Sequence, residues 1–243
     1  MILDDVLLLA APTSRSQAYL QALVAHDMLP GHVVLMGDQR PKPNPSLPVL
    51  EPAIVDLLLP RLDEPLLQTC ATSGISHETC DARNVNDAAI ADIIRSIQPR
   101  VVIYSGFGGQ IVGEAILSLG PRFLHMHSGD IPTYRGSTTL YYALLNGDHP
   151  TVTALFLDPR IDTGPIVARR TYPKPPAGAD IDHQYDSAIR ADLLLRVMRT
   201  RLLANGMIDA QPQPQVEDPP YYVIHPVLKH LAVLSLESRP DHA

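Results

Sequence analysis

The sequence feature that most constrains the fold is a series of short, unbroken apolar runs that alternate with helical patterns. The first run covers residues 6–10 and stops before Pro12, and the next covers residues 32–36, after a helical pattern that ends at Pro30. A strand that is apolar at every position is typical of parallel sheets, whose strands are buried on both faces. The first 36 residues therefore predict a β-α-β unit.

The alternation continues along the rest of the chain. Asn86 and Asp87 predict the start of a helix that ends before Pro99, and an apolar strand follows at 101–104. This order of elements predicts an α/β fold: a Rossmann-like, mostly parallel central sheet flanked by helices, with a C-terminal helical extension. The remaining expected elements are a loop at 39–52, a helix through Ile54, Leu57 and Leu58, helices at 111–119, 138–145 and 182–203, and strands at 123–127, 152–157 and 166–170.

Composition narrows the function classes. The net charge of −7 gives no basic surface for nucleic acid or anionic lipid, and no apolar stretch approaches the ~20 residues of a membrane span. The opening residues Met-Ile-Leu-Asp-Asp do not resemble a signal peptide. Cys70 and Cys80 match neither a zinc spacing nor a disulfide framework, so we expect buried thiols in a reducing compartment. We expect a cytoplasmic protein that acts on a small molecule, without nucleic acid or membrane partners.

Two histidines and a polar loop suggest where the chemistry takes place. His125 and His127 lie two residues apart on an expected strand, so their side chains point to the same face at its carboxyl end, where open α/β sheets bind ligands. A polar, glycine- and proline-containing loop follows at 128–136, and an acidic turn containing Asp162 follows the next strand. We therefore expect two imidazoles and one carboxylate to converge.

This region resembles the folate-dependent formyltransferases, the family that includes glycinamide ribonucleotide transformylase, methionyl-tRNA formyltransferase and sugar N-formyltransferases. The family pattern is Asn-x-His, a loop ending in Leu-Pro, a glycine, and then Asp-x-Gly. His127 lies at the catalytic histidine of the pattern, Ile131-Pro132 at Leu-Pro, and Asp162-Thr163-Gly164 at Asp-x-Gly. The resemblance is specific from about residue 101 to 173, and His125 replaces the asparagine of the family.

The resemblance implies an activity and a set of site residues. It implies formyl transfer from 10-formyltetrahydrofolate to a primary amine, within a catalytic domain at 1–177. Residues 178–243 would form an extension packed on that domain or on a partner subunit, with a homodimer as one arrangement. The folate-binding residues are expected in the glycine-rich segment Gly106, Phe107, Gly108, Gly109, Gln110 and Ile111, and the substrate-binding residues are expected to be Ser128, Asp130, Tyr134 and Arg135.

The reaction itself indicates what each catalytic group does. Attack of an amine on a formyl carbon passes through a tetrahedral intermediate, which requires a base and a donor to the oxyanion. An imidazole with the ordinary pKa of ~6.5 is mostly neutral at pH 7, which suits His127 as the base with Asp162 supporting it. His125 can donate to the oxyanion through a ring N–H, and Thr153, if its side chain points inward, can hold a catalytic water.

Two other function classes remain open at this stage. A His-x-His pair with a carboxylate is also the ligand set of a zinc-dependent amide hydrolase. The replacement of the family asparagine also allows a formyltransferase-like binding protein without turnover. The formyltransferase hypothesis expects no metal at the site. Because the chain is short and acidic, we expect the acceptor to be an amino sugar nucleotide or a specialised-metabolite amine instead of a tRNA.

Overall fold

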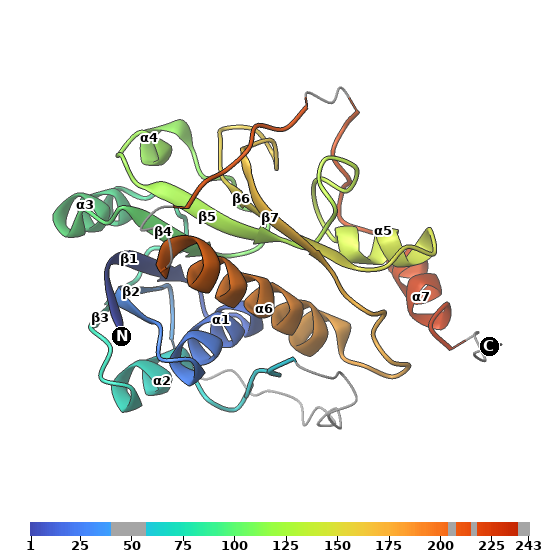
Figure 1. Ribbon diagram of the computed structural model, residues 1–243, viewed down its shortest axis with the longest axis horizontal. Coiled ribbons are helices and arrows are strands. Elements are labelled where there is room, and N and C mark those ends of the chain that lie inside the picture. Colours follow the sequence, from blue (N-terminus) through green and yellow to red (C-terminus); the bar gives the residue numbers. More distant parts are fainter. Residues whose placement is uncertain (40–56, 204–207, 215–217, 238–243) are drawn as a thin grey trace.

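The first β-α-β unit forms as its sequence predicts. The computed structural model describes residues 1–39, 57–203, 208–214 and 218–237, and Figure 1 shows their arrangement. Strand β1 (Ile2–Ala10) leads into helix α1 (Ser14–Ala25), and β2 (Leu29–Met36) returns parallel to β1. Thr13 caps α1, because its hydroxyl accepts a hydrogen bond from the Ser16 amide at 3.2 Å. The cap satisfies an amide that the helix itself leaves unpaired.

One sheet of seven strands runs through the molecule in the order β3-β2-β1-β4-β5-β6-β7. The first five of these strands are parallel, and β6 and β7 complete the sheet in antiparallel pairing. The strand order reverses between β1 and β4, which is where open α/β sheets form their ligand crevice. The later strands are β3 (His77–Cys80), β4 (Val101–Ser105), β5 (Arg122–His127), β6 (Thr151–Phe156) and β7 (Ile166–Thr171).

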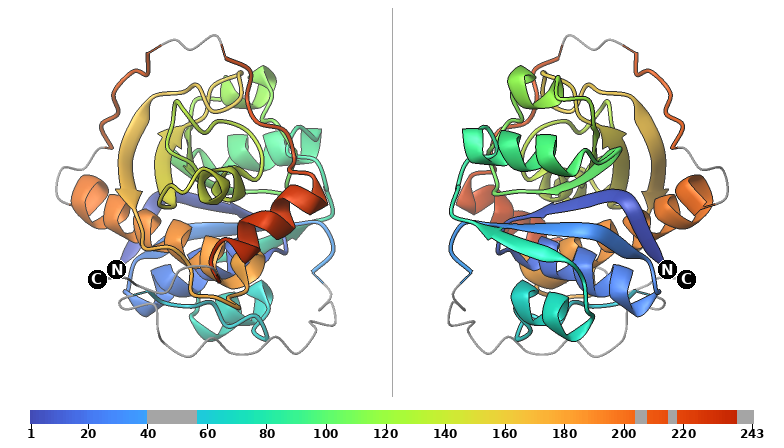
Figure 2. Two further views of the ribbon diagram at one scale, coloured as in Figure 1. Left: turned by 90° about the vertical axis from the view of Figure 1, so that its right-hand side faces the viewer. Right: turned by 90° about the vertical axis from the view of Figure 1, so that its left-hand side faces the viewer.

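Helices cover both faces of the sheet, as Figures 1 and 2 show. The buried side chains form two hydrophobic cores. Leu8 of β1 faces a core that contains residues of α1 and α6, whereas Leu7 and Leu9 face a second core that contains residues of α3. This arrangement confirms the expected mostly parallel α/β sheet with strands buried on both sides. The helices are α2 (Leu66–Thr72), α3 (Ala88–Ile97), α4 (Glu114–Leu117), α5 (Thr139–Leu145), α6 (Asp186–Val197) and α7 (Pro226–Leu234).

Some expected elements differ in the structure. The helix expected at 111–119 is only the four-residue α4, which begins after Gly113, and Ile111 lies outside it and is exposed. The expected helix through Ile54 lies partly outside the described residues, and Leu57 and Leu58 have no regular structure. Helix α2 and strand β3 were not expected. The sequence of β3 is His-Glu-Thr-Cys at the sheet edge, so it lacks the apolar run that marks the other strands.

Helix α6 packs against α1 and the sheet, and α7 packs against α5. The long helix expected at 182–203 is α6, preceded and followed by π-helical turns at Ile181–Tyr185 and Met198–Leu203. Its expected stripe is buried against α1 and the sheet, and consists of Ala188, Ala191, Leu194, Leu195 and Met198. Within the described part of the chain, no helix has both the length and the apolarity that crossing a bilayer would require.

Both cysteines are free and buried, as expected. Cys70, on α2, lies in the core that also contains residues of α1, and its burial can be tested through the pH dependence of stability. Burial raises the pKa of the Cys70 thiol to about 11. The unfolded chain therefore loses this proton at lower pH than the folded chain, so stability falls as pH rises from about 8 towards 11. Between pH 8 and pH 10 the free energy of unfolding should therefore fall by roughly 1 kcal/mol less in Cys70→Ala than in the unaltered protein. Urea unfolding of both proteins at the two pH values measures this difference, and parallel losses would contradict it.

Candidate active site

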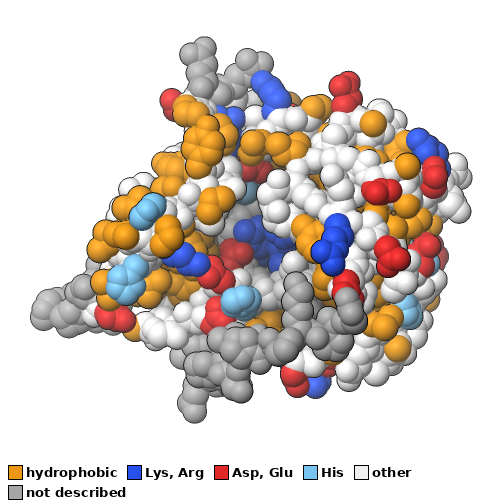
Figure 3. Space-filling model, turned by 180° about the vertical axis from the view of Figure 1, so that it is seen from behind, with side chains coloured by type: hydrophobic (Ala, Val, Ile, Leu, Met, Phe, Trp, Pro, Cys, Tyr) orange, Lys and Arg blue, Asp and Glu red, His pale blue; other side chains and the backbone are white. Residues whose placement is uncertain are grey.

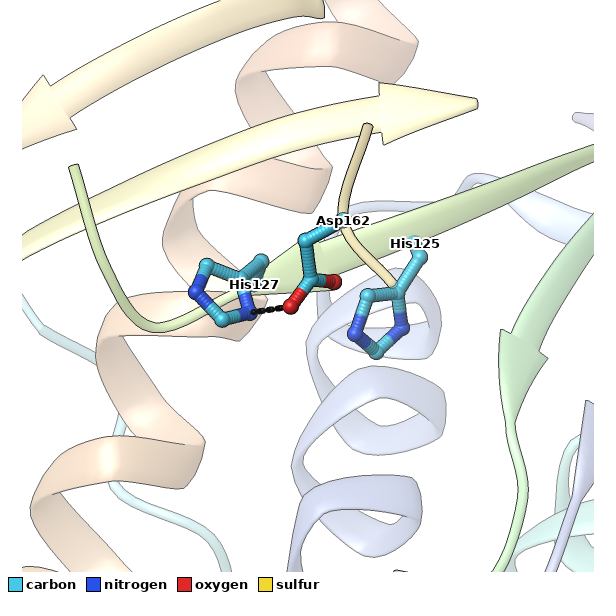
Figure 4. A group of neighbouring side chains, drawn as sticks. All are labelled: His125, His127 and Asp162. Carbon is cyan, nitrogen blue, oxygen red and sulfur yellow. Dashed lines mark ion pairs between the residues drawn. The ribbon is translucent and has the colours of Figure 1, made fainter. Parts of the chain in front are cut away.

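Strand β5 presents two imidazoles on one side. Leu124 and Met126 point into the core beneath α1 and α6, so His125 and His127 point to the opposite side of the strand. Their ring centroids lie 6.5 Å apart. Figure 4 shows both rings with the carboxylate of Asp162, which comes from the loop between β6 and β7. One ring nitrogen of each histidine and one carboxylate oxygen lie within 4.8 Å of one another, so the expected convergence of the three groups is present.

The contacts of His127 determine which ring nitrogen is available for chemistry. Its side chain is 5% exposed, and Nε2 lies 2.6 Å from the carbonyl oxygen of Tyr134. A carbonyl oxygen only accepts hydrogen bonds, so Nε2 carries a proton. In the neutral ring the lone pair is therefore on Nδ1, which lies 3.4 Å from Oδ2 of Asp162. Nδ1 is the atom of His127 that can accept a proton.

The backbone of the acidic turn fixes the position of Asp162. This residue has a positive φ of 54°, a left-handed conformation that aspartate and asparagine tolerate better than most residues. Its Oδ2 accepts a hydrogen bond from the Gly136 amide at 2.8 Å. A Cβ at Gly164 would lie 1.8 Å from the carbonyl oxygen of Phe156, so only glycine permits this close approach. These contacts place the Asp162 carboxylate beside the His127 ring.

His125 lies in an environment that keeps it uncharged. Burial, together with the positive charges of Arg15 and Arg190, holds the pKa of His125 well below its usual range. Its Nδ1 is buried and has no hydrogen-bond partner among the described residues. A neutral imidazole can still donate through one N–H, so His125 is available as a hydrogen-bond donor without a positive charge.

Sequence reasoning missed the two arginines near His125. Arg15, in the first turn of α1, donates hydrogen bonds to the Ser105 hydroxyl and the Gly106 carbonyl at the end of β4. Arg190 of α6 pairs with Asp186 at 2.8 Å and donates to the Met126 carbonyl, between the two histidines, at 2.6 Å. The i, i+4 spacing of Asp186 and Arg190 was a visible signal for the ion pair, but nothing in the sequence indicated its contact with β5.

Thr153 serves the loop after β5. Its register position is opposite His127, and its buried hydroxyl donates to the Gly129 carbonyl at 2.7 Å and accepts from the Ile131 amide at 3.3 Å. These two bonds occupy the hydroxyl with backbone groups of the loop. The structure therefore gives Thr153 a role in holding the loop, and its contact with a catalytic water stays a prediction.

A substitution at Thr153 tests this loop-holding role. Thr153→Val leaves a buried carbonyl and a buried amide without partners, so we expect a loss of about 1–3 kcal/mol in the free energy of unfolding. Thr151→Val is the matched control on the same strand, because the Thr151 hydroxyl pairs with the exposed Thr171 hydroxyl at 2.9 Å and with no buried backbone group among the described residues. Urea denaturation of both variants gives the comparison. Reduced turnover of Thr153→Val at unchanged stability would instead support the water-holding role.

The four expected substrate-binding residues have different surroundings. The Ser128 hydroxyl is buried and has no partner among the described residues, and Asp130 is exposed with an ion pair to Arg169 at 3.5 Å. The Tyr134 hydroxyl donates to the Asp148 carboxylate, and the Arg135 guanidinium donates to the Asp218 carbonyl. The polar ends of Tyr134 and Arg135 thus hold neighbouring segments of the protein itself.

The glycine-rich segment expected to bind folate forms an open surface turn after β4. A Cβ at Gly108 or Gly109 would meet no atom within 4 Å, and Ile111 is 51% exposed. Gly106 and Phe107 are instead constrained, because Gly106 lies against the Tyr104 ring and Phe107 packs against Gly37. The side chain of Gln110 bonds the backbone of Arg83 and Val85.

The surface has one hollow with charged side chains and one cavity with a mainly apolar lining. Figure 3 shows a hollow on the face opposite to that of Figure 1, with basic and acidic side chains at its bottom. A separate cavity of about 620 Å³ lies between α1 and α6 and is lined mainly by alkyl side chains such as Ala22, Ala188 and Leu195. That cavity does not include His125, His127 or Asp162. Functional polar groups converge at the histidines, so we place the candidate active site there.

Comparisons with known proteins identify relatives of the central part of the chain. A model of the formyl transferase family matches residues 62–187. The methionyl-tRNA formyltransferase of Chloroflexus aurantiacus is 35% identical over 134 residues, which cover 53% of this chain and 42% of that protein. That of Syntrophus aciditrophicus is 33% identical over 118 residues, covering 47% and 38%. The chain thus spans less than half the length of these relatives.

Solved structures share the fold at low sequence identity. Glycinamide ribonucleotide transformylase 1 from Symbiobacterium toebii has a TM-score of 0.56 and 17% identity, covering 86% of this chain and 93% of that one. An N-formyltransferase from Helicobacter canadensis, solved with folinic acid and dTDP-3-aminofucose, has a TM-score of 0.56 and 14% identity, covering 89% and 70%. The family model spans a little over half of the chain, and the chain belongs to the formyl transferase family.

Proposed function

We propose that this protein is an N-formyltransferase that moves a formyl group from 10-formyltetrahydrofolate to a primary amine of a small metabolite. The observation that carries the proposal is the His127 Nδ1 lone pair, which faces the Asp162 carboxylate at 3.4 Å with the His125 ring beside it. This arrangement supplies a base, a stabilising anion and a neutral hydrogen-bond donor in one place. Membership of the formyl transferase family supports the same reaction class.

In the proposed mechanism each residue handles one charge or one proton. As the amine nitrogen bonds to the formyl carbon, His127 Nδ1 accepts the proton that the nitrogen loses, and Asp162 stabilises the resulting imidazolium. His125 donates its ring N–H to the formyl oxygen, which gains negative charge. His127 then returns the proton to N10 of the folate as the old carbon–nitrogen bond breaks. The products are tetrahydrofolate and the N-formyl amine, and the enzyme is regenerated.

The residues present are compatible with a folate donor. The open turn at Gly108 and Gly109 leaves backbone groups accessible for a planar ring system, and it directly follows β4, the strand that lies next to β5. When bound, 10-formyltetrahydrofolate supplies the activated formyl carbon. We propose that Gly106, Phe107, Gly108, Gly109, Gln110 and Ile111 form the donor side of the site.

The acceptor is proposed from charge and from the structural relatives. A net charge of −7 opposes binding of a polyanionic tRNA, whereas the Helicobacter canadensis relative was solved with an amino sugar nucleotide. Methionyl-tRNA remains the second candidate acceptor, because the relatives from Chloroflexus aurantiacus and Syntrophus aciditrophicus carry that activity in their names. We propose an amino sugar nucleotide or a specialised-metabolite amine.

The experiment that tests this function follows release of tetrahydrofolate from 10-formyltetrahydrofolate in the presence of different amines. The panel contains amino sugar nucleotides, amino acids and methionyl-tRNA at equal concentration. Release that is accelerated by a small amine, with the N-formyl product identified by mass spectrometry, supports the proposal. Acceleration by methionyl-tRNA alone would replace the proposed acceptor, and no acceleration by any amine would overturn the function.

A further inference from the structure

Two segments that follow α6 bond to the loops around the candidate active site. They are residues 208–214 and 218–224, together called the C-terminal strap, and Figure 1 shows the second of them running past α5 into α7. Both lie beyond residue 187, where the match to the family ends. The strap bonds the acidic turn that contains Asp162 and the loop that follows His127.

The side-chain amide of Gln213 holds the acidic turn. Its Nε2 donates to the backbone carbonyl of Asp162 at 3.0 Å and to that of Gly164 at 2.6 Å. One amide group thus bonds the turn on both sides of its middle residue. Two backbone bonds of 2.8 Å between Gln211 and Ile166 fix the strap to the start of β7, just after the turn. The left-handed backbone of Asp162 is a conformation that persists only with such support from its surroundings.

The second segment of the strap holds the loop that faces this turn. The Tyr221 amide donates to the Arg135 carbonyl at 2.7 Å, and the Tyr221 carbonyl accepts from the Ser137 amide at 2.8 Å. These bonds enclose Gly136, whose own amide donates to the Asp162 carboxylate. A Cβ at Gly136 would lie 2.2 Å from the Tyr221 carbonyl oxygen, so the two backbones are in direct contact. The strap therefore supports both partners of the hydrogen bond that orients the carboxylate.

The ring of Tyr221 extends this support towards His127. It stacks on the Tyr134 ring with the centroids 5.8 Å apart, and its centroid lies 4.4 Å from that of Tyr142 on α5. The Tyr134 carbonyl accepts the hydrogen bond of 2.6 Å from His127 Nε2. The strap thus joins the loop that fixes the His127 proton to the turn that carries Asp162.

We propose that Gln213 is a positioning residue for the His127–Asp162 pair, because it ties the Asp162 turn to the strap while Tyr221 ties the facing loop to it. Gln213 acts through the backbone of the turn. His127 and Asp162 lie on separate parts of the chain, and a misplacement of about 1 Å in such a pair can lower a rate about 10²-fold. The effect on turnover rests on the proposed function, whereas the effect on the hydrogen bond between Gly136 and Asp162 does not.

The first test measures amide exchange in the full chain, without folate or amine. Gln213→Met keeps the length of the side chain and removes both donated bonds. We expect deuterium exchange of the Gly136 amide, followed by NMR, to become at least about 10-fold faster, because the turn that carries its acceptor is released. Gln211→Met is the matched control and should leave this rate unchanged, since the Gln211 side chain is exposed and its bonds to Ile166 come from the backbone. The amide of Leu8, in the buried strand β1, reports global unfolding in the same spectra.

The unaltered chain provides a measurement that depends on no variant. The side-chain amide protons of Gln213 should exchange more slowly than those of Gln211, because only the Gln213 amide is expected to be held by two carbonyls. Equal exchange of the two side chains would overturn the proposal. So would an unchanged Gly136 rate in folded Gln213→Met.

Turnover provides a readout that a purely structural role would not change. In Gln213→Met we expect the turnover number to fall about 10-fold while the KM values for folate and amine stay within about twofold, and Gln211→Met should change neither. Gln213→Glu should match Gln213→Met, because an ionised carboxylate donates no hydrogen bond. Equal turnover losses in Gln213→Met and Gln211→Met would overturn the positioning role. If the unaltered chain transfers no formyl group, the proposed function fails, and the exchange rates still decide whether Gln213 positions Asp162.

Discussion

His127→Gln is expected to lower the turnover number for formyl transfer about 10²- to 10⁴-fold, the contribution typical of a positioned general base. The glutamine amide can still donate to the Tyr134 carbonyl, which His127 Nε2 bonds at 2.6 Å, so the loop after β5 keeps its contact. The amide has no basic lone pair to accept the proton of the amine. The defect should therefore appear in turnover, while the free energy of unfolding stays close to that of the unaltered protein.

The control for this variant is His77→Gln on the edge strand β3. His77 also places a ring nitrogen near a backbone carbonyl, that of Ile75 at 2.8 Å, but it lies on a strand that does not contact β5. Steady-state rates of tetrahydrofolate release for both variants make the comparison. If His127→Gln retained more than about a tenth of the turnover number, His127 would not be the base.

The fold was largely predictable because most of its elements depend on local sequence patterns. The apolar run at 6–10 could be stable only between two layers of helices, and the predicted parallel sheet followed from several such runs. Strand β3 shows the limit of this reasoning. It is a four-residue strand at the sheet edge with two exposed positions, so its pairing with β2 comes from backbone hydrogen bonds that leave no hydrophobic pattern.

The candidate site was predictable where it depends on strand geometry and not where it depends on loop contacts. Alternation along β5 placed His125 and His127 on one side from the sequence alone. The direction of the Tyr134 side chain instead depends on Asp148, and the placement of Arg190 against β5 depends on the packing of α6. Such contacts join residues distant in sequence, and no periodicity records them.

Asp162 provides the second large expected effect, because its charge and its backbone conformation can be separated by substitution. Asparagine tolerates the left-handed conformation at this position and keeps an oxygen that can accept from the Gly136 amide. Asp162→Asn therefore removes the negative charge opposite His127 with little change in shape. Without that charge the imidazolium formed during transfer is less stable, so we expect the turnover number to fall roughly 10²- to 10³-fold.

The division of this effect between turnover and substrate binding distinguishes charge stabilisation from a general disturbance of the loop. Asp158→Asn is the matched control in the same turn, because Asp158 accepts from the Thr163 hydroxyl at 2.7 Å and from the Arg160 amide at 3.1 Å. Asp158→Asn loses the same negative charge at a position that takes no part in the proposed proton transfer. Its turnover number should therefore stay near that of the unaltered protein. An equal loss in both variants, or a change confined to the KM of Asp162→Asn, would show that Asp162 shapes the loop and does not stabilise the charged His127 ring.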